Sequence, residues 1–191
     1  MVRSPRNAGE AVEQHLENLA STAKSFTVKG FDGKMVEIGK GVENIYTPGK
    51  STKCKFDIRI GDYRLQVKSG TGHSATVLSA TLENLVKAGS RELFDVEPIT
   101  NVYQMLDSVK KVKLSDNFDK SEWSDLLTYF LFEGTSKSQE IPALQANYLL
   151  YWGKEEQILC NKKEAIDFLW ERLYVEKRMK GSQEVVSVRV K

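Results

Sequence analysis

Apolar residues recur every three or four positions between residues 7 and 24, which is the spacing of an amphipathic helix. The members of this stripe are Ala8, Val12, Leu16, Leu19 and Ala23. Asn7 can cap the first turn, and Glu10 follows three residues later, as in a capping box. We therefore predict a helix over 7–24 with one side facing a core.

Two later segments, 25–40 and 55–70, contain the alternation and turn residues of β-hairpins. The first turns at an Asp-Gly pair, and the second turns at Gly61 and Asp62. The second hairpin has the more regular pattern, because every other residue is apolar. These apolar residues are Phe56, Ile58, Ile60, Tyr63, Leu65 and Val67. They should face the core, which leaves a polar side opposite.

The rest of the chain predicts further elements. The predicted helices span 75–87, 102–112, 121–132 and 161–180, and the predicted strands lie within 146–161 and 184–190. No repeat or linker interrupts the pattern. We therefore predict one α/β domain over 1–191, with a core over 7–90 and an extension of helices and strands over 91–191.

Composition and net charge exclude several classes of protein. The 191 residues carry 28 Lys and Arg against 26 Asp and Glu, a net charge of +2, which excludes a polybasic tail protein and an acidic disordered one. No apolar run approaches the roughly 18 residues of a membrane span, and no signal peptide is evident, so we expect a cytoplasmic protein. Cys54 and Cys160 lack metal-ligand spacing, and we expect reduced, structural thiols.

The turn of the second hairpin determines which polar residues meet. A two-residue turn pairs Ile60 with Tyr63, and the same register places Asp57 opposite Gln66. Paired side chains lie on the same side of a sheet, and Lys68 is two residues beyond Gln66. Asp57, Gln66 and Lys68 should therefore form one cluster. The other polar residues on that side are Arg59 and Arg64.

An aspartate, an amide oxygen and a lysine on neighbouring strands suit metal-dependent phosphodiester hydrolysis. Mg²⁺ takes oxygen ligands, keeps several waters and needs few carboxylates. Asp57 would be the main ligand of Mg²⁺, for which Mn²⁺ can substitute, and Gln66 can ligate through its carbonyl oxygen. Lys68 would position or deprotonate the attacking water and offset negative charge.

The cluster resembles the PD-(D/E)XK nuclease superfamily, in which an Asp on one strand is followed on the next by an acidic residue, any residue and Lys. Here Asp57 is followed, after eight residues, by Gln66, Val67 and Lys68. Gln in the acidic position is similar to the variant in Mrr-like restriction nucleases. The resemblance implies a restriction-endonuclease-like core with a mixed central sheet flanked by helices. It also implies weaker metal binding unless another carboxylate compensates.

The same resemblance implies an acidic residue on the N-terminal helix, where GEAVEQHLENLA is similar to the family's pattern. Glu13 is the first candidate and Glu17, one turn later, is the alternate. If neither contributes, Glu37 and Glu43 are the next candidates for this carboxylate.

His73 can approach a phosphate or assist proton transfer, although a surface role is the alternative. Three lysines flank the hairpin and can either contact phosphates or be merely solvated: Lys50, Lys53 and Lys55.

These residues together predict a metal-dependent DNA endonuclease, most like a type II restriction endonuclease or its catalytic subunit. One active site cuts one strand, so cutting both strands of duplex DNA needs a second nuclease subunit, in a homodimer or with a recognition subunit. The apolar helices predicted over 121–132 and 161–180 are the expected partner surfaces. A junction-resolving or repair nuclease and a non-catalytic interaction module are the alternatives.

Overall fold

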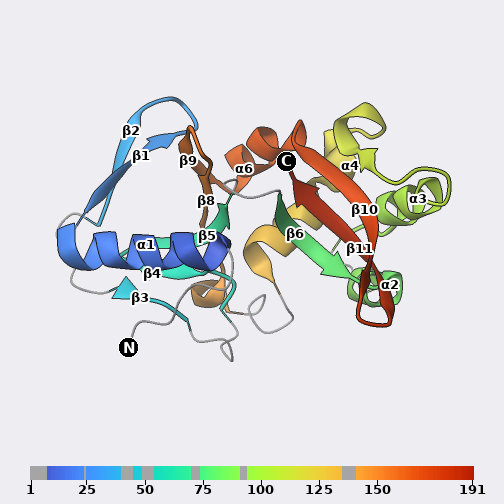
Figure 1. Cartoon of the computed structure of the whole chain (residues 1–191), viewed down its shortest axis with the longest axis horizontal. Coiled ribbons are helices and arrows are strands. Elements are labelled where there is room, and N and C mark those ends of the chain that lie inside the picture. Colours follow the sequence, from blue (N-terminus) through green and yellow to red (C-terminus); the bar gives the residue numbers. More distant parts are fainter. Residues whose placement is uncertain are drawn as a thin grey trace. The chain divides into compact units, whose positions relative to one another are not determined.

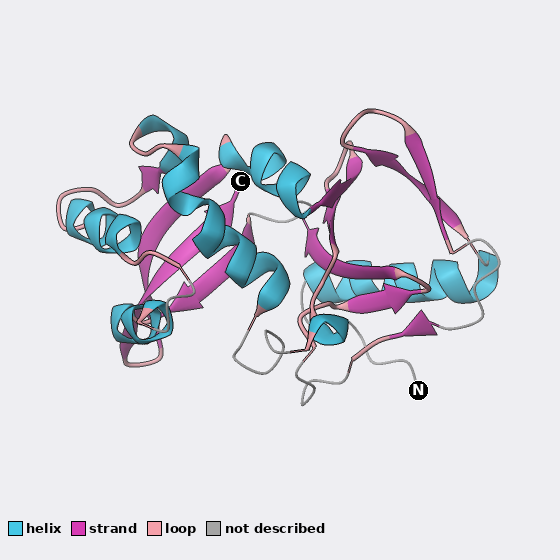
Figure 2. Ribbon diagram, turned by 180° about the vertical axis from the view of Figure 1, so that it is seen from behind, coloured by secondary structure: helices cyan, strands magenta, loops and turns pink. Residues whose placement is uncertain are grey.

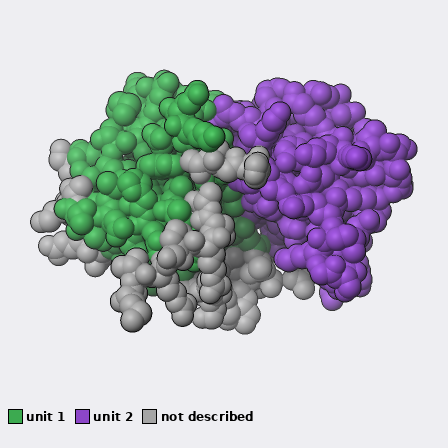
Figure 3. Space-filling model, viewed as in Figure 1, with its two compact units in different colours: residues 1–73, 131–165 green, residues 74–130, 166–191 purple. Residues whose placement is uncertain are grey.

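The structure is a computed structural model that describes residues 8–23, 25–39, 45–48, 54–69, 74–90, 94–134 and 141–191. The chain divides into two compact units, coloured separately in Figure 3. They comprise Met1–His73 with Leu131–Ala165, and Ser74–Phe130 with Ile166–Lys191. The predicted core over 7–90 does not follow this division, since residues 131–165 complete the first unit.

A mixed sheet forms the centre of the first unit (Figure 1). Within the described residues its strand order is β2-β1-β9-β8-β5-β4-β3. The strands are β1 (Phe26–Gly30), β2 (Met35–Ile38), β3 (Ile45–Tyr46), β4 (Ile58–Ile60), β5 (Tyr63–Ser69), β8 (Tyr148–Trp152) and β9 (Gln157–Asn161). Two neighbouring pairs, β5 with β8 and β1 with β9, are parallel. The architecture is therefore mixed α/β, as predicted.

Helix α1 (Ala8–Ala23) packs on this sheet and contacts β1, β3, β4 and β5. It confirms the predicted helix to within one residue at each end. Val12 and Leu16 of the predicted stripe are 6% and 0% exposed. They join a core that also contains Ile58, Leu65 and Val67 of the second hairpin. Burial of these side chains is what fixes the hairpin against the helix.

Both predicted hairpins are confirmed. The first turns through Gly33, whose φ of +85° is a left-handed conformation that glycine adopts without strain. The second turns at Gly61 and Asp62 and pairs Ile60 with Tyr63, in the predicted register. The positions of Asp57, Gln66 and Lys68 follow from this register.

Strand β5 lies inside the sheet, between β4 and β8, and its polar side is partly buried as well as its apolar side. On the polar side Gln66 is only 5% exposed, and on the apolar side Ser69 is only 9% exposed. The alternation along β5 indicated one core side and one polar side. It did not indicate burial on the polar side.

The second unit is built on an antiparallel sheet, with strand order β6-β11-β10-β7 in the described residues. Helices α2 (Leu82–Gly89), α3 (Glu97–Met105) and α4 (Lys120–Thr128) pack around it (Figure 2). The strands are β6 (Ala75–Ala80), β7 (Val112–Lys113), β10 (Leu173–Lys180) and β11 (Gln183–Val190).

The helix predicted over 75–87 is wrong in its first half. Residues Ala75–Ala80 form β6, which pairs antiparallel with β11, and α2 begins only after Thr81, whose hydroxyl accepts a hydrogen bond from Asn84 N–H. Pairing with a distant strand overrode the local helical pattern. The predicted succession of helix, two hairpins and helix is thus interrupted by a strand at its end, and a restriction-endonuclease-like core stays a prediction.

The long helix predicted over 161–180 is also wrong beyond its middle. Helix α6 (Lys162–Trp170) ends early, and Leu173–Lys180 forms β10. A turn through Gly181, with φ +64°, brings β11 alongside β10 over its whole length. The helix predicted over 102–112 is shifted instead, because α3 begins at Glu97, with Pro98 in its first turn, and ends at Met105.

The apolar helix predicted over 121–132 begins slightly earlier, at Lys120. Asp119 caps it in a capping box with Glu122. A π-helical turn (Tyr129–Glu133) continues it, and Gly134 follows with φ +76°. Its apolar side chains, including Trp123 at 0% exposure, fill the interior. These side chains are therefore used within the chain, and the expected partner surfaces on this segment and on the 161–180 segment stay a prediction.

Both cysteines are free thiols, and Cys160 is buried in β9. No helix in the described part of the chain is long and apolar enough to cross a membrane.

Candidate active site

Asp57 lies immediately before β4 and is held by three hydrogen bonds to the neighbouring strand β5. Its backbone N–H donates to the Leu65 carbonyl oxygen over 2.8 Å. Its Oδ2 accepts from the backbone N–H of Val67 over 2.7 Å and from Nε2 of Gln66. The carboxylate is therefore fixed across the ladder, opposite Gln66 as the register predicted.

Gln66 is the buried centre of this cluster. It is only 5% exposed, and in β5 it aligns with Leu149 of the parallel strand β8. Because Nε2 donates to Asp57, the carbonyl oxygen Oε1 is the end of the amide suited to a cation. The use of Gln66 as a neutral oxygen ligand stays a prediction.

Lys68 follows two residues later on the same strand and is mostly enclosed. Desolvation lowers the pKa of its ammonium group, while the negative charges of Asp57 and Glu13 oppose this effect. A lysine with a lowered pKa can exchange a proton nearer to neutral pH than an ordinary lysine. Lys68 is therefore suited to handling a proton as well as to offsetting charge.

Helix α1 contributes Glu13 to the same cluster. Burial raises the pKa of Glu13 to about 7, with further increases from the charges of Asp57 and Glu10 and an opposing effect of Lys68. Glu17, one turn later, is exposed, and its backbone carbonyl accepts a hydrogen bond from Ser21. Of the two glutamates predicted for this helix, the structure brings Glu13 to Asp57 and Lys68.

Lys55 is a further member of the cluster whose place the sequence analysis did not identify. Desolvation, followed by repulsion from Lys68, lowers the pKa of Lys55 to about 8, and Asp57 opposes this shift. Period-two alternation was an available signal in the sequence, since Lys55 is two residues before Asp57 and would share its side of an extended segment. The cluster therefore pairs two carboxylates with two lysines.

The two arginines expected beside the cluster have other contacts. The Arg59 guanidinium lies 5.5 Å from the centre of the Tyr46 ring, and Arg64 Nε donates to the Gln145 carbonyl oxygen over 2.7 Å. Both interactions direct these side chains to elements other than α1.

The remaining candidates do not join the cluster in the described part of the chain. Glu37 is exposed on β2 and accepts a hydrogen bond from Ser25 over 2.9 Å. The other predicted candidates lie outside the described residues: His73, Glu43, Lys50 and Lys53.

The donor set of the cluster fits a hard divalent cation. Asp57 and Glu13 supply carboxylate oxygens and Gln66 supplies an amide oxygen, which are ligand types that Mg²⁺ accepts. A cation near them would also relieve the repulsion that helps to raise the pKa of Glu13. No group of three or more His, Cys, Asp and Glu side chains suited to a metal occurs among the described residues. A metal here would therefore depend on two carboxylates and the amide.

The four charged groups of this site also have pKa values that differ from their ordinary values. Desolvation is the largest effect on each of the four charged groups: it raises the pKa of Asp57 and Glu13 and lowers that of Lys55 and Lys68. Groups with such shifts often gather where proton transfer occurs, although structural ion-pair networks produce them too. The arrangement can hold a cation, stabilise negative charge and move a proton within one site.

Comparison of the chain with known protein families and with curated protein sequences finds no match.

Proposed function

We propose that this chain is a metal-dependent endonuclease that hydrolyses phosphodiester bonds in double-stranded DNA. The observation that carries the proposal is the meeting of Glu13, Asp57, Gln66 and Lys68 in one enclosed cluster, drawn from α1 and from both strands of the second hairpin. Mg²⁺ or Mn²⁺ would be the cofactor. When bound, such an ion lowers the pKa of a water ligand and neutralises charge on the scissile phosphate.

Asp57 and Gln66 form the rigid part of the proposed site. The hydrogen bond between them and the bond from Val67 N–H to Asp57 hold both oxygen donors in place before any ligand arrives. Such preorganisation reduces the reorganisation that a reaction would otherwise require. Asp57 would hold the cation, and Gln66 would complete the donor set without adding charge.

Lys68 and Glu13 form the ionisable part. Lys68 would orient the attacking water, accept or share its proton, and offset the charge on the phosphate. Glu13 would supply the carboxylate that Gln66 does not. Because the pKa of Glu13 is about 7, it is half-ionised near neutral pH and is fully available to a cation only above that pH.

One such site handles one scissile phosphate, and the second strand of a duplex presents its phosphate with opposite polarity. We therefore propose that the chain nicks duplex DNA alone and cuts both strands only with a second nuclease subunit, in a homodimer or with a recognition subunit. A type II restriction endonuclease, or the catalytic subunit of one, is the enzyme class that fits this arrangement.

Incubation of supercoiled plasmid with the purified chain in Mg²⁺, Mn²⁺ or EDTA tests the proposal. We expect nicked or linear product with either metal and none in EDTA. Discrete fragments would identify a restriction enzyme, whereas cutting confined to branched DNA would replace this class with a junction-resolving nuclease. Absence of any cutting, by chain that sediments as a folded protein, would refute nuclease activity.

Gln66→Glu sharpens this test. The substitution adds a negative charge beside Asp57 and Glu13, so the Mg²⁺ concentration for half-maximal cutting should fall by roughly tenfold. An unchanged Mg²⁺ dependence would show that Gln66 is not a ligand.

A further inference from the structure

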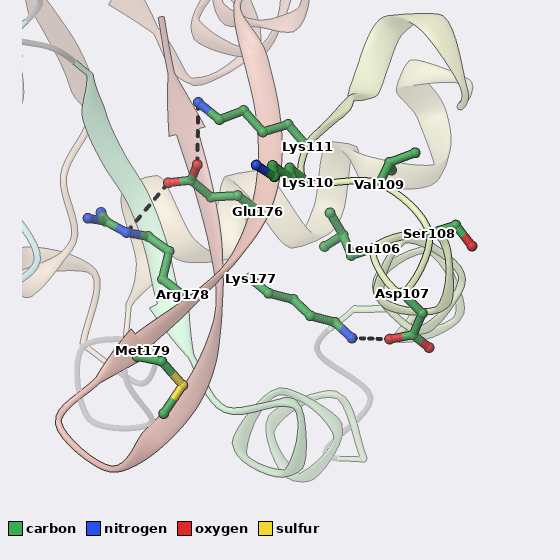
Figure 4. Close-up of a pocket in the computed structure, with 10 residues that line it drawn as sticks. All are labelled: Leu106, Asp107, Ser108, Val109, Lys110, Lys111, Glu176, Lys177, Arg178 and Met179. Atoms are coloured by element: carbon green, nitrogen blue, oxygen red, sulfur yellow. Dashed lines mark hydrogen bonds and ion pairs between the residues drawn. The ribbon is translucent and has the colours of Figure 1, made fainter.

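A groove of about 740 Å³ lies in the second unit, between the segment that follows α3 and the outer half of strand β10 (Figure 4). Its walls are residues 106–111 and residues 176–179. None of these residues belongs to the cluster in the first unit. The groove is therefore a separate feature that the proposed chemistry does not use.

Positive charge dominates the lining of the groove. Four cationic side chains line it, against two carboxylates, Asp107 and Glu176, which leaves a net charge of +2. The four are Lys110, Lys111, Lys177 and Arg178. The whole chain has a net charge of only +2, so this short lining is positively charged out of proportion to the rest of the chain.

Glu176 lies at the centre of this charge distribution, with 13% of its side chain exposed. Its carboxylate faces Lys111 at 3.5 Å, Arg178 at 3.6 Å and a third cation, Arg189, at 3.2 Å. One carboxylate cannot neutralise three cations. Two of these positive charges therefore remain available to an external anion.

Contacts within the protein already hold three cations of the groove in position. Lys111 and Arg178 are 59% and 51% exposed, yet both are oriented by Glu176. The ammonium group of Lys111 also lies 4.7 Å from the centre of the Tyr174 ring. Lys177 is 17% exposed and bonded to Asp107, and it lies over the Tyr103 ring at 3.7 Å. Binding would thus cost less side-chain entropy than binding by free lysines.

The backbone around the groove also suits a duplex. Strand β7 pairs with β10 only at Tyr174 and Val175, and β6 pairs with β11 only from Val186 onward. The outer part of the β10–β11 hairpin is therefore a two-stranded ribbon in the described structure, with Arg178 exposed on it. A ribbon of this kind fits the width of a DNA major groove while basic residues beside it reach phosphates.

We propose that this groove binds the phosphate backbone of duplex DNA and that the second unit thereby supplies DNA affinity to the chain. The identity of the polyanion rests on the nuclease function proposed above. Single-stranded nucleic acid fits less well, because it needs open aromatic faces for base stacking, whereas lysine ammonium groups lie over the rings of Tyr103 and Tyr174.

The experiment measures binding of the full chain to a fluorescein-labelled 25-base-pair duplex in EDTA, where no cutting is expected, at several salt concentrations. The test variant is the double substitution Lys110→Gln/Arg178→Gln. The matched control is Lys154→Gln/Lys163→Gln, which removes the same charge from exposed positions outside the groove. We expect the test variant to bind at least roughly tenfold more weakly, with the slope of log K against log salt reduced by about 1 to 2.

Several results would overturn the proposal: equal losses in the test and control variants, an unchanged salt slope, or wild-type chain that binds no duplex at low salt. Tighter binding to a single strand of the same sequence, or to vesicles of anionic lipid, would also overturn it. Cutting assays in Mg²⁺ separate this proposal from the nuclease. Salt-dependent binding through the groove without any cutting would refute the nuclease alone, and cutting that is insensitive to the groove variants would refute the groove alone.

Discussion

The two units place similar charged residues in opposite electrostatic settings. On β5 of the first unit, Gln66 is buried and Lys68 is half-buried, and desolvation is the largest effect on the pKa of Lys68. On β10 of the second unit, Arg178 is 51% exposed and shares Glu176 with other cations. Each strand is one half of an antiparallel hairpin.

Burial accounts for the difference. Enclosed charges interact strongly and have shifted pKa values, which suits proton transfer and cation binding but costs stability. Exposed charges are screened by water, which suits reversible contact with a polyanion and contributes little to folding. Under the two proposals, the first unit would carry out chemistry and the second would bind DNA, so substitutions in each should have different consequences.

The largest expected effect concerns the chemical unit. Asp57→Asn and Lys68→Met should each lower the cutting rate by about 10³-fold or more, because each removes a charged group from the reacting centre. These near-isosteric changes are preferable to alanine, since Asp57 Oδ2 accepts the Val67 N–H and its loss would leave that donor unpaired.

Plasmid cutting rates of these variants, alongside duplex binding in EDTA, provide the measurement. Asp62→Asn is the matched control, because Asp62 lies in the exposed turn of the same hairpin. Full activity of either test variant, with wild-type circular dichroism, would remove that residue from the site.

The second prediction concerns pH. Glu13 has a pKa of about 7 in the folded chain, so lowering the pH below 7 should reduce cutting by up to about tenfold per unit at low Mg²⁺. Higher Mg²⁺ competes with the proton and should move the midpoint to lower pH. Glu13→Gln should lower the rate and abolish this dependence, whereas Glu17→Gln should do neither. A wild-type profile in the Glu13 variant would exclude Glu13 as a ligand.

The same shift affects stability. The folded pKa of Glu13 lies above its unfolded value of 4.5, so its ionisation destabilises the fold progressively as pH rises from about 4.5 to about 7, and no further above that. In EDTA, Glu13→Gln should therefore unfold with a free energy roughly 1 to 2 kcal/mol higher than wild type at pH 8, after allowance for screening by solvent. The difference should be absent at pH 4, and urea titrations at both pH values measure it.

A substitution of Lys55 gives a further test of how burial of a charge affects stability. Its pKa of about 8 lies below the ordinary value of 10.5, so its charged form destabilises the fold most below pH 8 and ceases to do so above about 10.5. Lys55→Met should raise the free energy of unfolding at pH 7 by about 1 kcal/mol, since loss of the attraction to Asp57 offsets part of the gain. Lys154→Met, in an exposed turn, is the control. Equal effects of the two substitutions would contradict burial as the cause.

The smallest effect is expected at Arg178, which lines the groove of the second unit. Arg178→Gln should change the free energy of unfolding by less than about 0.5 kcal/mol, because its pairing with Glu176 is exposed. Arg189→Gln removes a mostly buried partner of the same carboxylate and should cost roughly 1 to 3 kcal/mol. Urea unfolding at pH 7 measures both values. A loss at Arg178 as large as that at Arg189 would indicate a structural role for the groove cations.

Local signals in the sequence were sufficient for α1, for both N-terminal hairpins and for the register that pairs Ile60 with Tyr63. In each case the partners are neighbours in sequence, so spacing and turn residues carry the information. The same local geometry was sufficient to predict the approach of Asp57 to Gln66. The choice of Glu13 and Glu17 on the helix came from the family resemblance and not from this geometry.

Elements with distant partners were not predictable in this way. Residues Ala75–Ala80 form a strand because they pair with β11, which is distant in sequence, and no local pattern indicates that pairing. The error over Leu173–Lys180 has a different cause, because its partner β11 follows directly after a two-residue turn that contains Gly181, and the prediction of one long helix missed this local hairpin. The burial of Gln66 and the lowered pKa of Lys55 arise only in the folded unit, and the local pattern of the hairpin did not indicate either of them. The sequence therefore indicated which residues form the cluster better than it indicated their environment.

The parallel pairing of β5 with β8 has a consequence for how the chain folds during synthesis. Every residue of the proposed cluster has left the ribosome once residue 68 has emerged, but the neighbour that encloses β5 begins only at Tyr148. The intervening segment must emerge first, and closing so long a loop is slow. Until then β5 is an uncovered strand edge that can pair with another chain. Refolding of the chain should accordingly show the hairpin before the enclosed site, with aggregation concentrated in the interval between them.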